Sequence, residues 1–278
     1  MQACVVVIGD SRARGLADSL VCHLEPTIKV EDHACGGDTL DDVYTKLKRS
    51  TRTCLKHHHH KCVVVILAGI CSLTDRERTQ AGFETSFRLS LAENKTTDIK
   101  TTIEQIFNYT SDRGIFVIIC SIYPGSLVKH MTHRIQQGRL IQRRVTYSEP
   151  QLQEQQKALV SCVEEVNDHI KSESLKHSLV TYLNIHKLLE VRSKKTVGNS
   201  KTKRKRIISF SFNHLVDGLH PDEGLQNSIR NKIEVACRKL ITHPVDASSQ
   251  SDSECTEPRS KLHKVDTGNF KRPKHLCN

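Results

Sequence analysis

The sequence predicts an α/β fold, a three-layer α/β/α flavodoxin-like sandwich around a mostly parallel five-stranded sheet. Dense apolar blocks alternate with amphipathic stretches along residues 1–240, and the blocks are rich in β-branched residues. Parallel strands that helices cover on both faces have this continuous apolar pattern. By analogy with flavodoxin-like folds we expect the strand order 2-1-3-4-5, with right-handed crossovers.

The five expected strands are the apolar blocks of the first 190 residues. They are Cys4–Ile8, Thr27–Glu31, Cys62–Ala68, Ile115–Cys120 and Leu179–Leu183.

Helices are expected between these strands because apolar residues there recur at helical spacing. Asp38 or Thr39 can cap the second helix, and Gly114 ends the third. Two polar segments, Phe83–Lys95 and Gly125–Ser148, are expected to be loops over the strand ends, with a short helix as the alternative for the first. The expected helices run from Ser11 to about His23, then Leu40–Leu55, Thr97–Arg113, Glu149–Lys171 and Pro221–Leu240.

Composition indicates one domain over residues 1–242 and a tail. Residues 192–206 hold eight Lys or Arg and no acid, which predicts a basic loop within the domain. Residues 243–278 are rich in Ser, Pro and charge, a composition typical of disordered tails. The net charge of +11 permits binding to anionic partners, but charge alone does not define a site.

Cysteine use and the apolar runs bear on the compartment. The eleven cysteines form no Cys-x-x-Cys pair, and several lie inside expected strands, which favours a reducing compartment over a disulfide scaffold. No run approaches the ~20 apolar residues of a membrane span. The N-terminus lacks the apolar region of a signal peptide. We therefore expect an intracellular protein, cytoplasmic or nuclear.

Ser11 is the first candidate for chemistry. It follows Gly9-Asp10 directly after the first expected strand, and ligands of open α/β sheets bind at the carboxyl ends of strands. A serine at a helix start would lie beside free N–H groups that can stabilise an oxyanion. A simple helix cap is the alternative for this motif alone.

Asp217 and His220 form a second candidate pair just before the last expected helix. A serine hydroxyl needs a base, usually His, and that base needs an acceptor to fix its tautomer. An Asp three residues before a His can supply both groups. The alternative is a helix start in which Pro221 takes the first helical position and His220 has no role.

Four short blocks in this order resemble the SGNH (GDSL-type) hydrolase superfamily. The resemblance covers roughly residues 1–240 and places each block next to the expected element. The blocks are Gly9-Asp10-Ser11, Cys35-Gly36-Gly37-Asp38-Thr39-Leu40, Leu67-Ala68-Gly69-Ile70-Cys71-Ser72 and Asp217-Gly218-Leu219-His220.

The resemblance implies a serine esterase or acyl hydrolase that acts on a small acyl or ester substrate without a metal or organic cofactor. Ser11 would be the nucleophile, His220 the general base and acid, and Asp217 its orienting partner. The backbone N–H groups of Ser11 and Gly37 would form the oxyanion hole.

The third block departs from the family pattern, Gly-x-Asn-Asp, at the residue that supplies a third oxyanion donor. Cys71 stands where the family has Asn, and a thiol is a weak donor. Losing one such donor costs about 10²–10³ in turnover elsewhere. Two hypotheses stay open: an enzyme that is slow or uses another donor, and an inactive protein that keeps the fold.

Two further motifs resemble binding segments. His57–His60 are adjacent and cannot all face one ion, so no metal site is expected. Lys201–Arg206 could bind nucleic acid or direct nuclear import, with a solvated loop as the alternative. Under the second hypothesis above, this basic segment would hold nucleic acid or an acidic partner. No aromatic residues are interleaved with it, so phosphate contacts would carry such binding.

Overall fold

The computed structural model describes most of residues 3–242, and all of the described residues belong to one compact unit, Met1–Val245. The expected tail, 243–278, lies outside them, as do His57–His60 and residues 201–203. The described ranges are 3–56, 61–78, 84–89, 95–138, 149–196 and 204–242.

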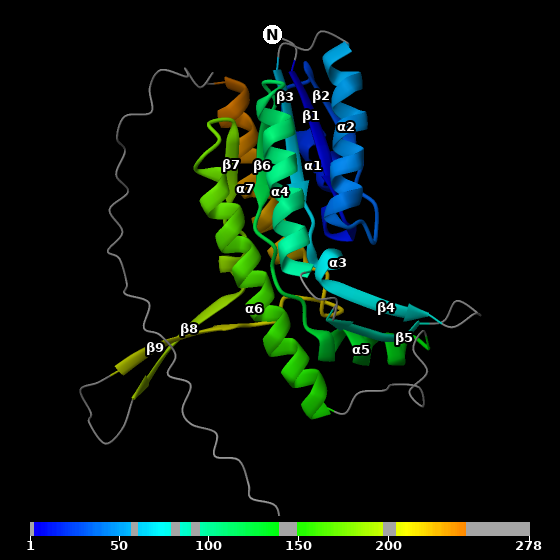
Figure 1. The fold of residues 1–278 in the computed structure, drawn as a ribbon, viewed down its shortest axis with the longest axis vertical. Helices are drawn as coiled ribbons and strands as arrows, with labels where there is room; N and C mark the ends of the chain where they lie inside the picture. The colour runs from blue at the N-terminus through cyan, green and yellow to red at the C-terminus, as the bar shows by residue number, and fades with distance from the viewer. Residues whose placement is uncertain are drawn as a thin grey trace, which may run out of the picture. The chain divides into compact units, whose positions relative to one another are not determined.

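A five-stranded parallel sheet forms the centre of the unit (Figure 1), in the order β2-β1-β3-β6-β7. Each strand pairs in parallel with its neighbour. Counted along the sheet strands alone, this is 2-1-3-4-5, so the predicted order is confirmed. The strands are β1 (Ala3–Gly9), β2 (Ile28–Asp32), β3 (Lys61–Leu67), β6 (Phe116–Cys120) and β7 (Val180–Leu183).

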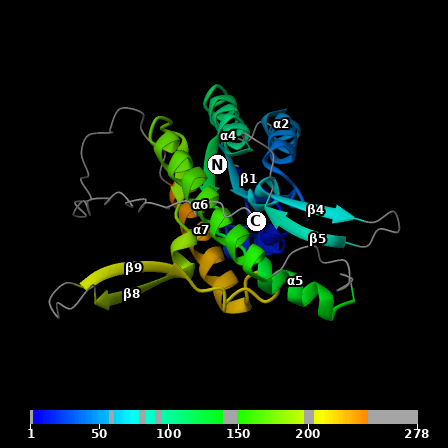
Figure 2. The same cartoon turned by 60° about the horizontal axis from the view of Figure 1, so that its bottom comes forward.

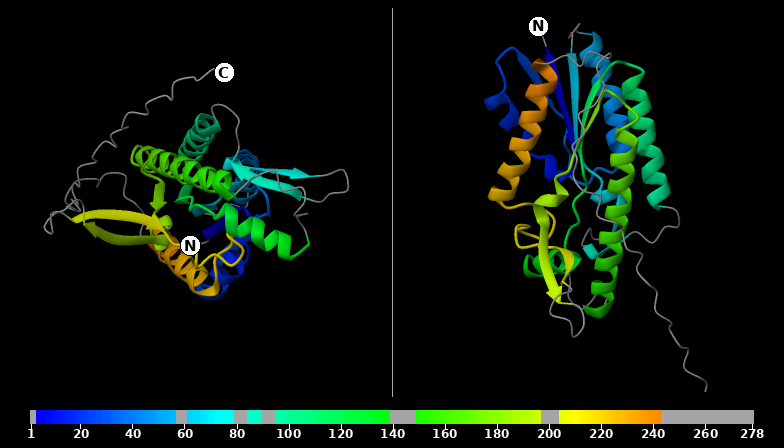
Figure 3. Two further views of the ribbon diagram at one scale, coloured as in Figure 1. Left: turned by 90° about the horizontal axis from the view of Figure 1, so that it is seen from below. Right: turned by 90° about the vertical axis from the view of Figure 1, so that its left-hand side faces the viewer.

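Helices cover both faces of this sheet, as the edge-on view in Figure 3 shows. On one face, α2 (Leu40–Lys56), α4 (Lys95–Ser111) and α6 (Glu149–Ser174) bury their apolar residues against Val6, Val64 and Val117. On the other, α1 (Leu16–His23) and α7 (Glu223–Thr242) pack on Val5, Val63 and Ile118. Alternate residues of each central strand therefore enter opposite cores, which explains the continuous apolar runs. The predicted three-layer α/β/α architecture is confirmed.

Two antiparallel hairpins lie outside the sheet. One contains a strand where the sequence predicted a loop or short helix, Phe83–Lys95, and the other overlaps the predicted basic loop, 192–206. Strands β4 (Thr74–Arg78) and β5 (Glu84–Leu89) pair with each other, and so do β8 (Glu190–Thr196) and β9 (Arg204–Phe210). Figure 2 shows the two hairpins extending in different directions from the helices.

The loop predicted for residues 192–206 is therefore wrong at both of its ends. The β8–β9 ladder pairs Arg192 with Ile208 and continues to Thr196 opposite Arg204. Backbone pairing needs no apolar alternation in its side chains, so a run of Lys and Arg concealed these strands.

Helix α5 (Leu127–Gln136) corrects the loop predicted for residues 125–148. The Ser126 hydroxyl accepts a hydrogen bond from the Lys129 N–H and caps the helix. Leu127 and Met131, four residues apart, are buried. The helix lies beside the carboxyl end of the sheet, next to the β4–β5 hairpin (Figure 2).

The segment after β1 differs from the predicted continuous helix. Ser11–Ala13 forms a single 3-10 turn, and α1 starts only at Leu16, after Gly15 with a φ of 70°. A turn of this length has almost no macrodipole, so the predicted support of an oxyanion by a helix end is absent at Ser11. In the described residues, no helix is both long and apolar enough to cross a bilayer.

Candidate active site

Ser11 lies at the carboxyl end of β1, next to the carboxyl end of β3. The Asp10 N–H donates to the Leu67 carbonyl at 3.2 Å, which carries the β1–β3 pairing one residue past the strand. The Asp10 carboxylate then accepts a hydrogen bond from the backbone N–H of Arg12 at 2.9 Å. The chain turns sharply at this point and presents the Ser11 side chain beyond the edge of the sheet.

The loop before α7 brings Asp217 and His220 to the same edge. Gly218 has a φ of 85°, and a Cβ atom there would lie 2.6 Å from the Ser126 carbonyl oxygen and from the His130 nitrogen. Only glycine fits that backbone and that space. The Ser126 N–H donates to the Gly218 carbonyl at 2.7 Å, so the start of α5 fixes the loop.

Ser11, His220 and Asp217 form a continuous chain of hydrogen bonds. His220 Nε2 lies 2.7 Å from Ser11 Oγ, and His220 Nδ1 lies 2.7 Å from Asp217 Oδ2. A carboxylate accepts the proton on Nδ1, which leaves Nε2 as the acceptor for the serine hydroxyl. This is the tautomer that a general base needs.

Asp217 is held as a carboxylate by its surroundings. Burial acts to raise its pKa, but hydrogen bonds from the His220 ring and from the backbone N–H groups of His220 and Leu219 outweigh it. The two N–H groups donate to Oδ1 at 2.8 and 3.0 Å. The pKa of Asp217 therefore lies well below its usual range, and the group stays negative opposite the imidazole.

Gly37 occupies the third position of a turn over the same cleft. The Asp38 N–H donates to the Cys35 carbonyl at 3.3 Å, and Gly37 has a φ of 93°. A type II turn requires positive φ at this position. No atom lies within 4 Å of the place where a Gly37 side chain would start, so the turn borders open space.

A cleft of about 300 Å³ opens above the serine. It brings Ser11, Gly37, Asp217 and His220 together, although they are as many as 209 residues apart in sequence. The described residues that line it are Ser11, Arg14, Gly36, Gly37, His130, His133, Arg134, Gln137, Asp217 and His220.

Cys71 is not among those lining residues. It lies in the short helix α3 (Ile70–Leu73), partly buried against the core cluster on the α2, α4 and α6 face. Its neighbour Ser72 is buried, and its hydroxyl accepts the Leu40 N–H at 2.8 Å. The third block thus anchors the start of α2, while its thiol does not border the cleft.

Four lining residues from α5 and its end were not among the site residues predicted from the sequence: His130, His133, Arg134 and Gln137. His130 is buried, and its Nδ1 lies 3.1 Å from the Asp217 carbonyl oxygen and 3.9 Å from Asp217 Oδ2. The signal for this helix was present in the spacing of Leu127 and Met131. Nothing in the sequence shows that the helix packs against the Asp217 loop.

A buried ion pair stabilises the turn that carries Ser11. Asp10 is 0% exposed, and its carboxylate accepts Arg12 Nη2 at 2.6 Å and Nε at 2.9 Å. The guanidinium also donates to the Tyr123 carbonyl at 3.3 Å and lies 4.6 Å from the centre of the Tyr123 ring. The pair therefore ties the turn after β1 to the segment that leaves β6.

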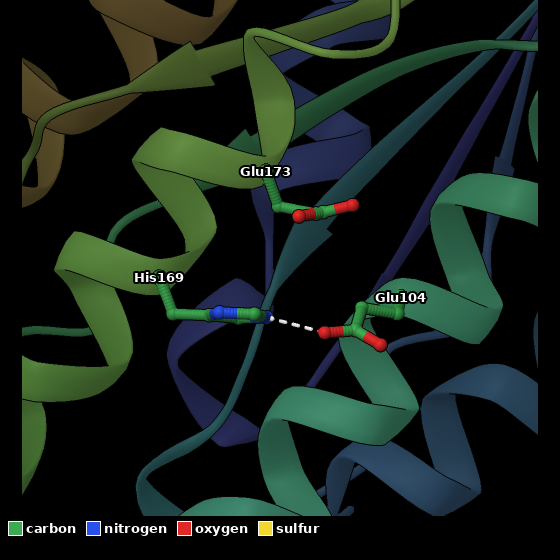
Figure 4. Close-up of side chains that lie close together, drawn as sticks. All are labelled: Glu104, His169 and Glu173. Carbon is green, nitrogen blue, oxygen red and sulfur yellow. Dashed lines mark ion pairs between the residues drawn. The ribbon is translucent and has the colours of Figure 1, made fainter.

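Among the described residues, one group has the composition of a metal site, and it lies far from the cleft. The ligand atoms of Glu104, His169 and Glu173 lie within 4.8 Å of one another, between α4 and α6 (Figure 4). Glu173 lies at the C-terminal end of α6, which leads into β7 at the amino edge of the sheet, whereas Ser11 lies at the carboxyl edge.

A lysine and a further histidine already contact a carboxylate of this group. Lys176 Nζ lies 2.6 Å from Glu173 Oε2, and His177 Nε2 lies 3.6 Å from Glu173 Oε1. His169 Nε2 lies 3.3 Å from Glu104 Oε1. Lysine supplies the positive charge that a metal ion would bring, so the group is explained as a network that links the two helices.

Comparison with known proteins finds similarity in structure alone. No family model and no curated protein matches the sequence. A GDSL-like lipase from Bacteroides thetaiotaomicron superposes with a TM-score of 0.53 at 13% identity, covering 85% of this chain and 88% of the lipase. A candidate acylhydrolase from Bacteroides fragilis gives 0.53 at 13% identity, over 86% of this chain and 88% of its own. This chain therefore has the fold of the GDSL-like (SGNH) hydrolases.

Proposed function

We propose that this chain is a serine ester hydrolase of the SGNH type, with Ser11 as nucleophile and His220 and Asp217 as its partners. The observation that carries the proposal is the hydrogen-bonded chain from Ser11 Oγ through His220 to Asp217, with 2.7 Å at each step. It opens onto a cleft at the carboxyl edge of a parallel sheet, where ligands of such folds bind.

The proposed reaction proceeds in two steps. His220 Nε2 takes the hydroxyl proton as Ser11 Oγ attacks the acyl carbon, and the imidazolium then returns that proton to the departing alcohol. His220 then takes a proton from water, which attacks the acyl carbon. The bond from that carbon to Ser11 Oγ breaks, His220 returns the proton to Oγ, and the carboxylic acid is released. The negative Asp217 stabilises the imidazolium that forms in each step.

The oxyanion would be bound by backbone donors. The N–H groups of Ser11 and Gly37 have no acceptor among the described backbone hydrogen bonds. Since Cys71 does not line the cleft, we expect turnover lower by about 10²–10³ than in an enzyme with a third donor.

Labelling with a fluorophosphonate probe tests the proposal. A fluorophosphonate reacts only with a serine that a base has activated, so we expect the purified chain to be labelled at Ser11. Ser11→Ala and His220→Ala should both abolish the labelling. Ser228→Ala removes an exposed serine of α7 and should leave it unchanged. A folded wild-type protein that is not labelled, or labelling that survives Ser11→Ala, would contradict the proposal.

A further inference from the structure

The cleft above Ser11 is polar and basic. The ten described residues that line it include no aliphatic, Phe, Tyr or Trp side chain, and Asp217 is the single carboxylate among those ten. Accepting the proposed hydrolase function, we infer that the substrate is an anionic ester, and that Arg14 and the cleft-facing side of α5 bind its negative group.

Arg14 lies beside the reacting groups. It ends the 3-10 turn that begins at Ser11. Its Nη2 lies 2.6 Å from the point where a Gly36 side chain would start, and that point is 3.7 Å from Ser11 Cβ. The guanidinium therefore lies over Gly36. The gap between it and Ser11 is small enough for one carboxylate or phosphate group to bridge. A side chain at position 36 would displace the guanidinium from this place.

The charge of Arg14 faces the cleft without compensation. The residue is exposed, and no carboxylate among the described residues pairs with it. A planar guanidinium matches carboxylate and phosphate oxygens with two parallel hydrogen bonds. An arginine placed this way attracts an anion more strongly in a concave site than on an open surface.

Helix α5 adds further donors on the other side of the cleft. His133, Arg134 and Gln137 lie at or near its C-terminal end and line the same space as Arg14. They supply a guanidinium, and an amide and an imidazole that contact each other, with Gln137 Nε2 2.7 Å from His133 Nε2. A polar wall of this kind offers nothing to a long hydrocarbon chain, whose burial would need apolar contacts.

The charge that stays uncompensated in the cleft is positive. No described carboxylate pairs with Arg14, and the Asp217 carboxylate is already occupied by the His220 ring and two backbone N–H groups. An ester with a carboxylate or phosphate near its reacting bond is therefore attracted, whether that group lies on the acyl or on the alcohol side.

Kinetics with two matched pairs of esters test this inference. Mono-4-nitrophenyl succinate against 4-nitrophenyl butyrate places the charge on the acyl side, and 4-carboxyphenyl acetate against 4-carbamoylphenyl acetate places it on the alcohol side. In at least one pair we expect kcat/KM of the charged ester to exceed that of its neutral partner about tenfold, the effect of one charge-assisted contact of ~1.4 kcal/mol. The preference should fall at about 0.5 M salt because ions screen exposed charges.

Two variants identify the source of that preference. Arg14→Gln should reduce the ratio of charged to neutral kcat/KM to near one, while Arg52→Gln, an exposed arginine of α2, should leave the ratio as in the wild type. A wild-type ratio near one in both pairs overturns the inference, as does a ratio that Arg14→Gln does not change.

Binding to Ser11→Ala separates this inference from the proposed catalysis. Calorimetric titration of that variant with the same four esters measures affinity where no serine ester can form. We expect at least one charged ester to bind about tenfold more tightly than its neutral partner, and Arg14→Gln to remove the difference. If the wild type hydrolyses no ester while this difference persists, the proposed function fails and the anion site stands. Equal affinities, or no binding, overturn the anion site.

Discussion

Replacement of Arg12 by Met would test how the turn that carries Ser11 is held. Asp10 is 0% and Arg12 5% exposed, and three hydrogen bonds from the guanidinium, at 2.6, 2.9 and 3.2 Å, reach the carboxylate. In Arg12→Met the buried carboxylate retains only the bond from the backbone N–H of residue 12 at 2.9 Å. The Tyr123 carbonyl also loses its donor at 3.3 Å.

The magnitude follows from the charge that is left behind. Removing one partner of a buried ion pair costs about 3–5 kcal/mol, because the other charge stays without compensation. The orphaned Tyr123 carbonyl adds to this, at about 1–3 kcal/mol for a buried acceptor. We therefore expect Arg12→Met to lower the free energy of unfolding by at least about 3 kcal/mol, measured by urea denaturation followed by far-UV circular dichroism.

A double-mutant cycle distinguishes the ion pair from simple loss of packing. Asp10→Asn removes the charge and keeps an oxygen for the N–H of residue 12, so the double variant holds no unpaired ion. We expect its loss in free energy of unfolding to be smaller than the sum of the two single losses by about 2 kcal/mol or more. Arg52→Met, on the exposed surface of α2, should change stability by less than about 0.5 kcal/mol. Additive effects of the two single changes would refute the reasoning.

Two further predictions concern the segments that meet at the cleft. Asn167 is buried, and its amide bonds both the N–H and the carbonyl of Ile122, at 2.7 and 2.6 Å. Asn167→Leu leaves two buried backbone groups unsatisfied and should cost about 2–5 kcal/mol in urea denaturation; an effect below 1 kcal/mol would contradict the role of these bonds. Asp217 has a lowered folded-state pKa, so its stabilisation is complete above its unfolded value of about 3.9 and is lost as pH falls. The stability difference between wild type and Asp217→Asn should therefore shrink from pH 7 to pH 3, and a difference that grows on acidification would contradict it.

The sheet could be predicted because its strands are buried on both faces. Runs such as Val63–Ile66 enter two cores at once, and no other position in a protein of this size requires such continuous apolar sequence. The order of the strands then followed from the analogy with flavodoxin-like folds. Observed strand ends differ from the predicted ones by at most one residue, within the usual uncertainty of such boundaries.

The hairpins could not be predicted, for a physical reason. Neither β4 nor β8 belongs to the sheet that forms the core, and each pairs with one partner strand. The ladder is made by backbone groups, which every residue carries, so Thr74–Arg78 and residues 192–196 have no apolar pattern to detect. Helix α5 is a different case, because Ser126 as cap and Leu127 and Met131 at a spacing of four were visible in the sequence.

The candidate catalytic residues came from motifs, whereas the residues that would select a substrate came only from the structure. Ser11 and His220 belong to short blocks whose order can be recognised without coordinates. Arg14 and His133 have no such context: their proximity depends on how the turn after β1 and helix α5 pack around the Gly218 loop. Whether Lys201–Arg206 binds nucleic acid stays a prediction, since residues 201–203 lie outside the described chain.

In the proposed mechanism, oxyanion binding depends on the backbone around Gly37, because Cys71 does not line the cleft. The Cys35 N–H donates to the Gly9 carbonyl at 2.9 Å, and the Leu40 N–H donates to Ser72 Oγ at 2.8 Å. These bonds fix the turn at both ends, to the strand that precedes Ser11 and to α3. A donor held in place before charge develops contributes its full electrostatic stabilisation, because nothing reorganises during the reaction. We therefore expect this site, with Cys71, to hydrolyse esters more slowly than a site with a third donor. We still expect it to exceed the uncatalysed rate of hydrolysis in water.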